Sequence, residues 1–120
     1  MNNTKIGLRQ FTYNLVIEMN FSVLMSVYKN DNAGYLSRAI ESVTLEQTLR
    51  PNQLVLVEDG LVSQEITDVI DKWKIKLDGK IKFTVIPLKK NSGLAIALNK
   101  GLTYCENELV ARMDSDDISL

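Results

Sequence analysis

From Phe21 onward, short apolar runs alternate along the chain with longer segments in which apolar residues recur at helical spacing. Strands of a parallel sheet read as nearly continuous apolar runs, because helices cover both faces of such a sheet. The apolar runs predict four strands, at 21–28, 54–57, 81–86 and 109–113. No internal repeat interrupts the alternation. The pattern predicts an α/β fold with a doubly wound, mainly parallel, Rossmann-like sheet that ends at the fourth strand.

Three helices are predicted between these strands. The first ends before Arg50-Pro51, Ser63 is a suitable cap for the second, and Asp78-Gly79 ends the second. The segment Asn91-Ser92-Gly93 opens the third helix. The residues expected to face the core are Leu36, Ala39, Ile40 and Val43 on the first helix, Ile66, Val69, Ile70, Trp73 and Leu77 on the second, and Leu94, Ala97, Leu98, Gly101, Leu102 and Cys105 on the third.

Residues 1–20 differ from the rest, because they carry two short apolar patches without a clear period. We expect them to form a poorly ordered leader, and Met19, directly before the first strand, is a candidate for the natural start. Residues 21–120 are expected to form a single domain, the only one that this length allows.

The composition of the chain excludes several kinds of partner and of chemistry. With 14 basic and 15 acidic residues the net charge is −1, so no overall field draws the chain to nucleic acid. There is no histidine, which excludes histidine acid–base chemistry and most zinc sites, and the lone Cys105 excludes a disulfide within the chain. Because no run of about 18 apolar residues exists, we expect a cytoplasmic location, with peripheral contact at the inner face of the membrane left open.

Polar residues follow three of the predicted strands. Ser26 and Tyr28 end the first, Glu58 and Asp59 follow the second, and Asp114-Ser115-Asp116-Asp117 follows the fourth. The carboxyl ends of parallel strands meet at one edge, and ligands bind there where the strand order switches. We therefore expect these residues to converge.

The acidic cluster is the strongest chemical signal in the chain. Three carboxylates this close repel one another unless a cation lies among them. Mg²⁺ in such sites takes one or two carboxylates and completes its shell with phosphate oxygens and water. The cluster predicts a site for Mg²⁺ or Mn²⁺ and a diphosphate, with Asp114, Asp116 and Asp117 as candidate metal ligands. A solvated acidic turn is the alternative.

The other candidates also have two interpretations. Asp59 could accept hydrogen bonds from a ribose or a base, or could serve as a turn or capping carboxylate. Tyr28 could stack on a base or cap the core. Asn91, Ser92 and Gly93 could supply amide donors to a ligand, although helix capping explains them equally well.

In order and spacing, four segments resemble the donor-binding half of the family 2 nucleotide-sugar glycosyltransferases, which have the GT-A fold. They are SVLMSVY at 22–28, LVLVEDG at 54–60, NSGLA through NKGL at 91–102, and ARMDSDD at 111–117. The resemblance implies metal-dependent, inverting transfer of a sugar from a nucleotide-diphosphate donor, UDP-sugar by preference. The acceptor would be a glycan or a lipid-linked molecule, as in polysaccharide biosynthesis.

The resemblance also implies roles for single residues. Ser26 and Tyr28 would line the nucleoside pocket, and Asp59 would bind uracil or ribose. Asp114 and Asp116 would form a D-x-D motif that holds Mn²⁺ or Mg²⁺. The acidic run can also be read as a motif that includes Asp117, and Asp116 is common to both readings. The implied donor-binding residues are Ser26, Tyr28, Glu58, Asp59, Asn91, Gly93 and Asp114. No catalytic residue is assigned, because the resemblance places the base in a later segment.

Two departures accompany the resemblance, since many relatives have Asp at Glu58 and Arg at Leu98. Three alternatives stay open. A dinucleotide-binding oxidoreductase would need a G-x-G-x-x-G motif, but residues 28–34 contain one glycine. A phospho-acceptor receiver domain would need acidic residues at Lys29 and Pro87. An inactive fragment would not bind donor. We also expect self-association through the exposed edge of 109–113.

Overall fold

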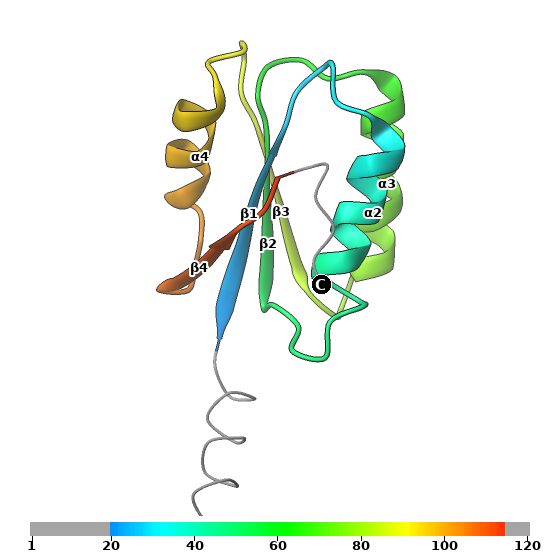
Figure 1. Ribbon diagram of the computed structural model, residues 1–120, viewed down its shortest axis with the longest axis vertical. Coiled ribbons are helices and arrows are strands. Elements are labelled where there is room, and N and C mark those ends of the chain that lie inside the picture. The colour runs from blue at the N-terminus through cyan, green and yellow to red at the C-terminus, as the bar shows by residue number, and fades with distance from the viewer. Residues whose placement is uncertain (1–19, 115–120) are drawn as a thin grey trace, which may run out of the picture.

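The computed structural model describes residues 20–114, which form one parallel sheet with helices on both faces (Figure 1). Helices α2 (Ala33–Val43), α3 (Gln64–Leu77) and α4 (Leu94–Leu102) alternate with the strands. The sheet order is β3-β2-β1-β4, and each neighbouring pair is parallel. The four strands are β1 (Phe21–Val27), β2 (Gln53–Glu58), β3 (Lys82–Pro87) and β4 (Leu109–Arg112). The predicted α/β class and the parallel sheet are confirmed.

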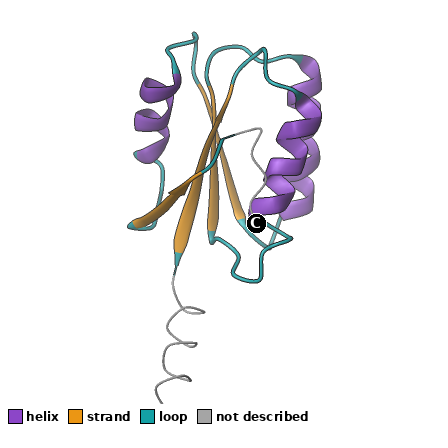
Figure 2. Ribbon diagram, in the orientation of Figure 1, coloured by secondary structure: helices purple, strands orange, loops and turns teal. Residues whose placement is uncertain are grey.

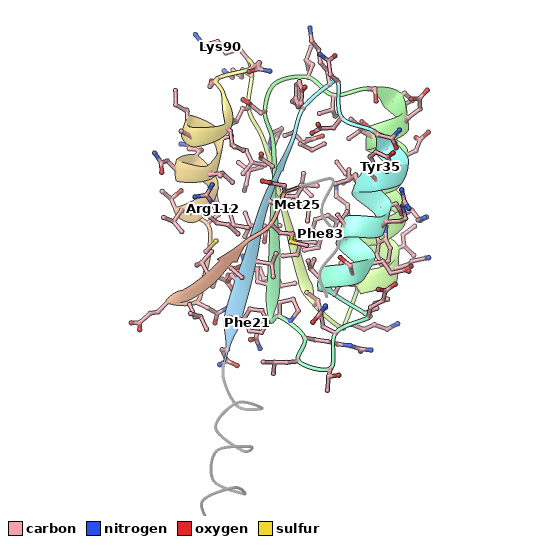
Figure 3. All side chains as sticks on the ribbon, viewed as in Figure 1. Phe21, Met25, Tyr35, Phe83, Lys90 and Arg112 are labelled. Carbon is pink, nitrogen blue, oxygen red and sulfur yellow. The ribbon has the colours of Figure 1, made fainter. Side chains whose placement is uncertain are left out.

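The two faces of the sheet differ in their cover. Helices α2 and α3 pack together on one face, and α4 covers the other, as Figure 2 shows. Successive side chains of β1 point to opposite faces, so Val23 and Met25 join the larger core under α2 and α3 while Leu24 joins the smaller core under α4. In Figure 3 Met25 lies in the middle of the molecule. The sheet is therefore buried on both sides, as its apolar runs predict.

The helix caps follow the sequence closely. Ser63 accepts a hydrogen bond from the Ile66 amide at 3.2 Å and caps α3, as predicted. Asn32 caps α2 in the same way, through the Tyr35 amide at 3.0 Å. The predicted core residues of α2 are all buried, and of those on α3 only Val69 is partly exposed.

The prediction for α4 is partly wrong. Leu94 and Leu102 are 53% and 50% exposed, whereas Cys105, beyond the end of the helix, is partly buried and packs against the smaller core as predicted. This helix has only nine residues, and it turns a narrow stripe of Ala97, Leu98 and Gly101 to the sheet. A Cβ at Gly101 would lie 2.5 Å from Val57 Cγ2, so the glycine permits a close approach that leaves the flanking leucines outside.

A buried polar network that the sequence did not reveal closes the amino-terminal end of the sheet. The Gln53 side chain accepts hydrogen bonds from Ser22 Oγ and the Glu106 amide, both at 2.9 Å, and donates one to the Tyr104 carbonyl at 3.0 Å. These bonds join β1, β2 and the loop after α4. The edge at which the sequence predicts ligand binding is the opposite one.

Some predictions fall on residues 1–19 and 115–120, which lie outside the described part. They are the leader, Ser115, Asp116 and Asp117. No helix within residues 20–114 is long and apolar enough to cross a membrane.

Candidate functional site

A pocket of about 360 Å³ opens at the carboxyl edge of the sheet. The chain runs outward from β1 to β2 and β3 and then crosses to β4 on the other side of β1, so the strand order switches here. The pocket is lined by Ser26, Tyr28, Asp31, Asp59, Asn91, Gly93, Leu94 and Asp114. The predicted convergence is therefore observed for Ser26, Tyr28, Asp59 and Asp114. Asn91 and Gly93, which the resemblance implied as donor-binding residues, line the same pocket.

The loop after β1 is a tight turn that presents Tyr28 to the pocket. The Tyr28 amide donates to Asp31 Oδ2 at 3.0 Å, and the Asp31 amide donates to the Tyr28 carbonyl at 3.0 Å. Tyr28 keeps part of its ring exposed. Asp31 was not among the predicted site residues, although an Asp in a turn before a helix cap was an available signal.

Asp59 occupies the centre of the edge and is only 6% exposed. Its Oδ1 accepts a hydrogen bond from the Ser92 amide at 2.7 Å, and its Oδ2 accepts one from the Gly93 amide at 3.0 Å. Its own amide donates to the Val27 carbonyl at 2.8 Å. A carboxylate offers about four acceptor positions, so Asp59 retains acceptor capacity for a ligand.

Glu58 does not line the pocket, which differs from the role that the resemblance implied. Along β2 the side chains alternate, and Glu58 shares the face of Leu54 and Leu56, which pack under α2 and α3. Burial raises the pKa of Glu58, nearby Lys74 lowers it in part, and Asp71 adds to the rise. The structure thus separates Glu58 from its neighbour Asp59.

Replacing Glu58 with glutamine is expected to change the pH dependence of stability. A folded-state pKa above the ordinary 4.5 means that the folded chain holds the proton more tightly than the unfolded one. Wild-type stability should therefore fall, relative to Glu58→Gln, as the pH rises from 4.5 through the raised pKa. Thermal unfolding of both proteins from about pH 3.5 to about pH 7 measures this. Parallel curves over that range would contradict the assignment.

The pocket is rich in carboxylates, since Asp31, Asp59 and Asp114 all line it. These three do not gather tightly enough to share one ion, and no other group of three acidic or cysteine side chains does so between residues 20 and 114. A diphosphate would meet like charge here unless a cation entered with it. Asp114, which follows β4, is the member of the predicted acidic cluster that lies within the described residues.

A basic hollow of about 220 Å³ adjoins the pocket and shares Asp59 and Asn91 with it. Lys29, Lys89 and Lys90 line this hollow, and Lys90 projects from the loop before α4 (Figure 3). Within residues 20–114 the only ion pair joins Lys82 and Glu106, so the three lysines have no acidic partner there. They supply positive charge beside an acidic pocket, a feature that the sequence analysis missed.

Two curated relatives are similar to this chain over most of its length. One is the UDP-Gal:alpha-D-GlcNAc-diphosphoundecaprenol beta-1,3-galactosyltransferase of Escherichia coli, 44% identical over 82% of this chain and 34% of that protein. The other is the amylovoran biosynthesis glycosyltransferase AmsE of Erwinia amylovora, 42% identical over 83% of this chain and 36% of that protein. The chain thus spans about a third of the length of these relatives.

Solved structures share the fold. The mannosyltransferase PcManGT from Pyrobaculum calidifontis, in complex with GDP-Man and Mn²⁺, superposes with a TM-score of 0.72 at 19% identity, over 85% of this chain and 29% of that one. S. aureus TarS 1–349 gives 0.67 at 27% identity, over 83% and 28%. Both are consistent with the expected GT-A fold. A family model described as Glycosyl transferase family 2 matches residues 22–120, and the chain belongs to that family.

Proposed function

We propose that this chain forms the donor-binding part of a glycosyltransferase that uses a nucleoside-diphosphate sugar. The observation that carries the proposal is the convergence of Ser26, Tyr28, Asp59 and Asp114 in one pocket at the strand-order switch. The pocket offers the partly exposed aromatic ring of Tyr28, the buried carboxylate of Asp59 and the carboxylate of Asp114. Those are the groups that a base, a ribose and a metal-bound diphosphate require.

We propose uridine as the base, because the name of the Escherichia coli relative gives UDP-Gal as its donor. That name also gives a lipid-linked diphosphate sugar as the acceptor, which supports a glycan or lipid-linked acceptor. We further propose a cytoplasmic position with peripheral contact at the inner face of the membrane. We propose an inverting reaction, with the base that deprotonates the acceptor in a part of the enzyme that this chain does not contain.

We propose Asp114 as a metal ligand, with Asp116 and Asp117 as the further members of the acidic motif. The complex of PcManGT with GDP-Man and Mn²⁺ supports a divalent ion in this fold. The ion would neutralise charge that develops on the leaving diphosphate. Asp114 would hold it against the phosphates, while Ser26 and Tyr28 would contact the nucleoside.

Calorimetric titration of UDP into this chain tests the proposal. We expect binding in the presence of Mn²⁺ and at least about tenfold weaker binding with a chelator, because the acidic pocket repels an uncompensated diphosphate. Uridine, which lacks the phosphates, is the matched ligand control and should respond little to the metal. UDP binding that is equal with and without Mn²⁺ would contradict metal-supported donor binding, and the absence of any UDP binding would contradict the whole proposal.

We also expect the isolated chain to self-associate along β4. Between residues 20 and 114 no strand pairs with the outer edge of β4, and Leu109 on this strand is 49% exposed. An apolar edge strand with unpaired backbone groups tends to pair with another chain. Sedimentation at increasing protein concentration should show dimers that Val110→Pro weakens, because proline cannot donate a strand hydrogen bond. A monomer at all concentrations would count against this edge.

A further inference from the structure

We propose that Asp59 and Gly60 position the loop at Asn91, Ser92 and Gly93, and that Asp59 supports nucleotide binding largely through this loop. Asp59 would thus be a positioning residue, whatever direct contact it makes with a ligand. This role extends the proposed donor binding and rests on it in one respect, the identification of the pocket as the nucleotide site. The loop geometry itself can be tested without a ligand.

The first observation is the use of the Asp59 carboxylate. Each of its oxygens accepts one backbone amide of the loop, Ser92 at 2.7 Å and Gly93 at 3.0 Å. Gly93 is the N-cap of α4, and as a glycine it makes no side-chain capping bond of its own. A buried carboxylate needs such partners, because an unpaired charge away from water is strongly disfavoured. Asp59 therefore fixes the entry to α4 from the end of β2, more than thirty residues earlier in the chain.

The second observation is the close approach of backbones beside Asp59. Gly60 has a φ of 88°, and a Cβ placed on it would lie 2.7 Å from the Asn91 amide nitrogen. That neighbour is a backbone atom, so a larger residue would have to push the whole loop away. Glycine adopts this φ without strain, and because it has no Cβ it leaves room for the backbone of Asn91.

The loop held in this way is a wall of the pocket. Asn91 and Gly93 both line it, as does Leu94 at the start of α4. Within the loop, Asn91 Oδ1 accepts the Gly93 amide at 3.2 Å, a contact between near neighbours that cannot place the loop against the sheet. Two hydrogen bonds to Asp59 and the close approach of Gly60 join the loop to the end of β2. Losing them should displace the wall against which the nucleotide packs.

The variant Asp59→Asn separates positioning from direct binding. Asparagine keeps the shape, but it has one acceptor oxygen and turns an N–H₂ group towards the second amide. Amide hydrogen exchange, resolved by residue in NMR spectra of the ligand-free chain, should accelerate at least about tenfold at Ser92 and Gly93. Exchange in β1 should not change, and UDP affinity in Mn²⁺ should fall at least about tenfold. Asp78→Asn, an exposed carboxylate at the end of α3, is the matched control and should change neither quantity.

Gly60→Ala keeps the experiment decisive if Asp59→Asn does not fold. It leaves the carboxylate in place and should shift the resonances of Asn91 and Ser92 while it weakens UDP binding. Unchanged exchange at Ser92 and Gly93 in Asp59→Asn would overturn the inference, and so would unmoved Asn91 and Ser92 resonances in Gly60→Ala. Lost UDP affinity with an unmoved loop would make Asp59 a direct ligand only. If the wild-type chain binds no UDP, the proposed function fails, while the exchange data still decide whether Asp59 positions the loop.

Discussion

Replacing Asp114 with asparagine is expected to abolish the part of UDP binding that depends on Mn²⁺. The substitution retains the size of the side chain and removes the charge that a hard divalent cation needs. Asp114 follows β4 and lines the same pocket as Ser26, Tyr28 and Asp59. Because an essential metal ligand is lost, affinity for UDP in Mn²⁺ should fall by about tenfold to a hundredfold.

Calorimetry with a fixed excess of Mn²⁺ measures this loss, and Asp78→Asn provides the same chemical change at the far end of the sheet. The variant should bind UDP as weakly in Mn²⁺ as the wild-type chain does in a chelator. Retention of wild-type affinity in Asp114→Asn would move the metal to other ligands and would leave Asp114 as part of an ordinary turn.

Replacing Trp73 with alanine is expected to lower the free energy of unfolding by about 3–5 kcal/mol. The side chain is 1% exposed and is the largest in the core between the sheet, α2 and α3. Its indole Nε1 donates to Ser37 Oγ at 2.9 Å, which joins α3 to α2. The Lys76 ammonium lies 4.9 Å from the ring centroid and adds a smaller contribution. For a domain with a total stability of about 5–15 kcal/mol, such a loss is severe.

Urea unfolding followed by circular dichroism is the suitable measurement, since Trp73 is the only tryptophan and its fluorescence disappears with it. Ile75→Ala is the matched control on the same helix, because Ile75 is 79% exposed and its loss should cost less than about 0.5 kcal/mol. A loss below about 1 kcal/mol for Trp73→Ala would mean that α3 does not pack as described.

The strands and two of the helices were predictable because their signals are local. Apolar runs identify strands that are buried on both faces, and Ser63 and the 3.6-residue spacing identify α3. The core stripe of α4 was predicted too wide, because apolarity alone does not show which side of a short helix meets the sheet. Gly101 was the clue, since a small residue permits the close approach that leaves Leu94 and Leu102 exposed.

The candidate site was predictable as a set of strand ends but not as a set of contacts. Topology alone brings Ser26, Asp59 and Asp114 to one edge, and the sequence supports that topology. The sequence could not show that Asp59 binds the Ser92 and Gly93 amides, because that depends on the exact position of a distant loop. It also could not show that the Glu58 side chain, which the resemblance had placed at the donor, lies on the face of the sheet that α3 covers.

The family assignment removes two of the alternatives that the sequence left open. A chain of glycosyl transferase family 2 is neither a dinucleotide-binding oxidoreductase domain nor a receiver domain. The third alternative, a fragment that fails to bind donor, is the one that binding experiments must address. It matters because this chain spans about a third of its curated relatives, 34% and 36% of the two described above.

The most direct test of the central claim, that the carboxyl edge of this sheet binds a nucleoside diphosphate, is an NMR titration of UDP with Mg²⁺ into the isotopically labelled chain. We predict shifts that cluster at Ser26, Tyr28, Asn91, Gly93 and Asp114, with little change at the opposite end of the sheet around Lys80. Replacing Mg²⁺ with Mn²⁺ should broaden the resonance of Asp114 in particular. Shifts confined to the Lys80 end, or no shifts at saturating UDP, would contradict the account.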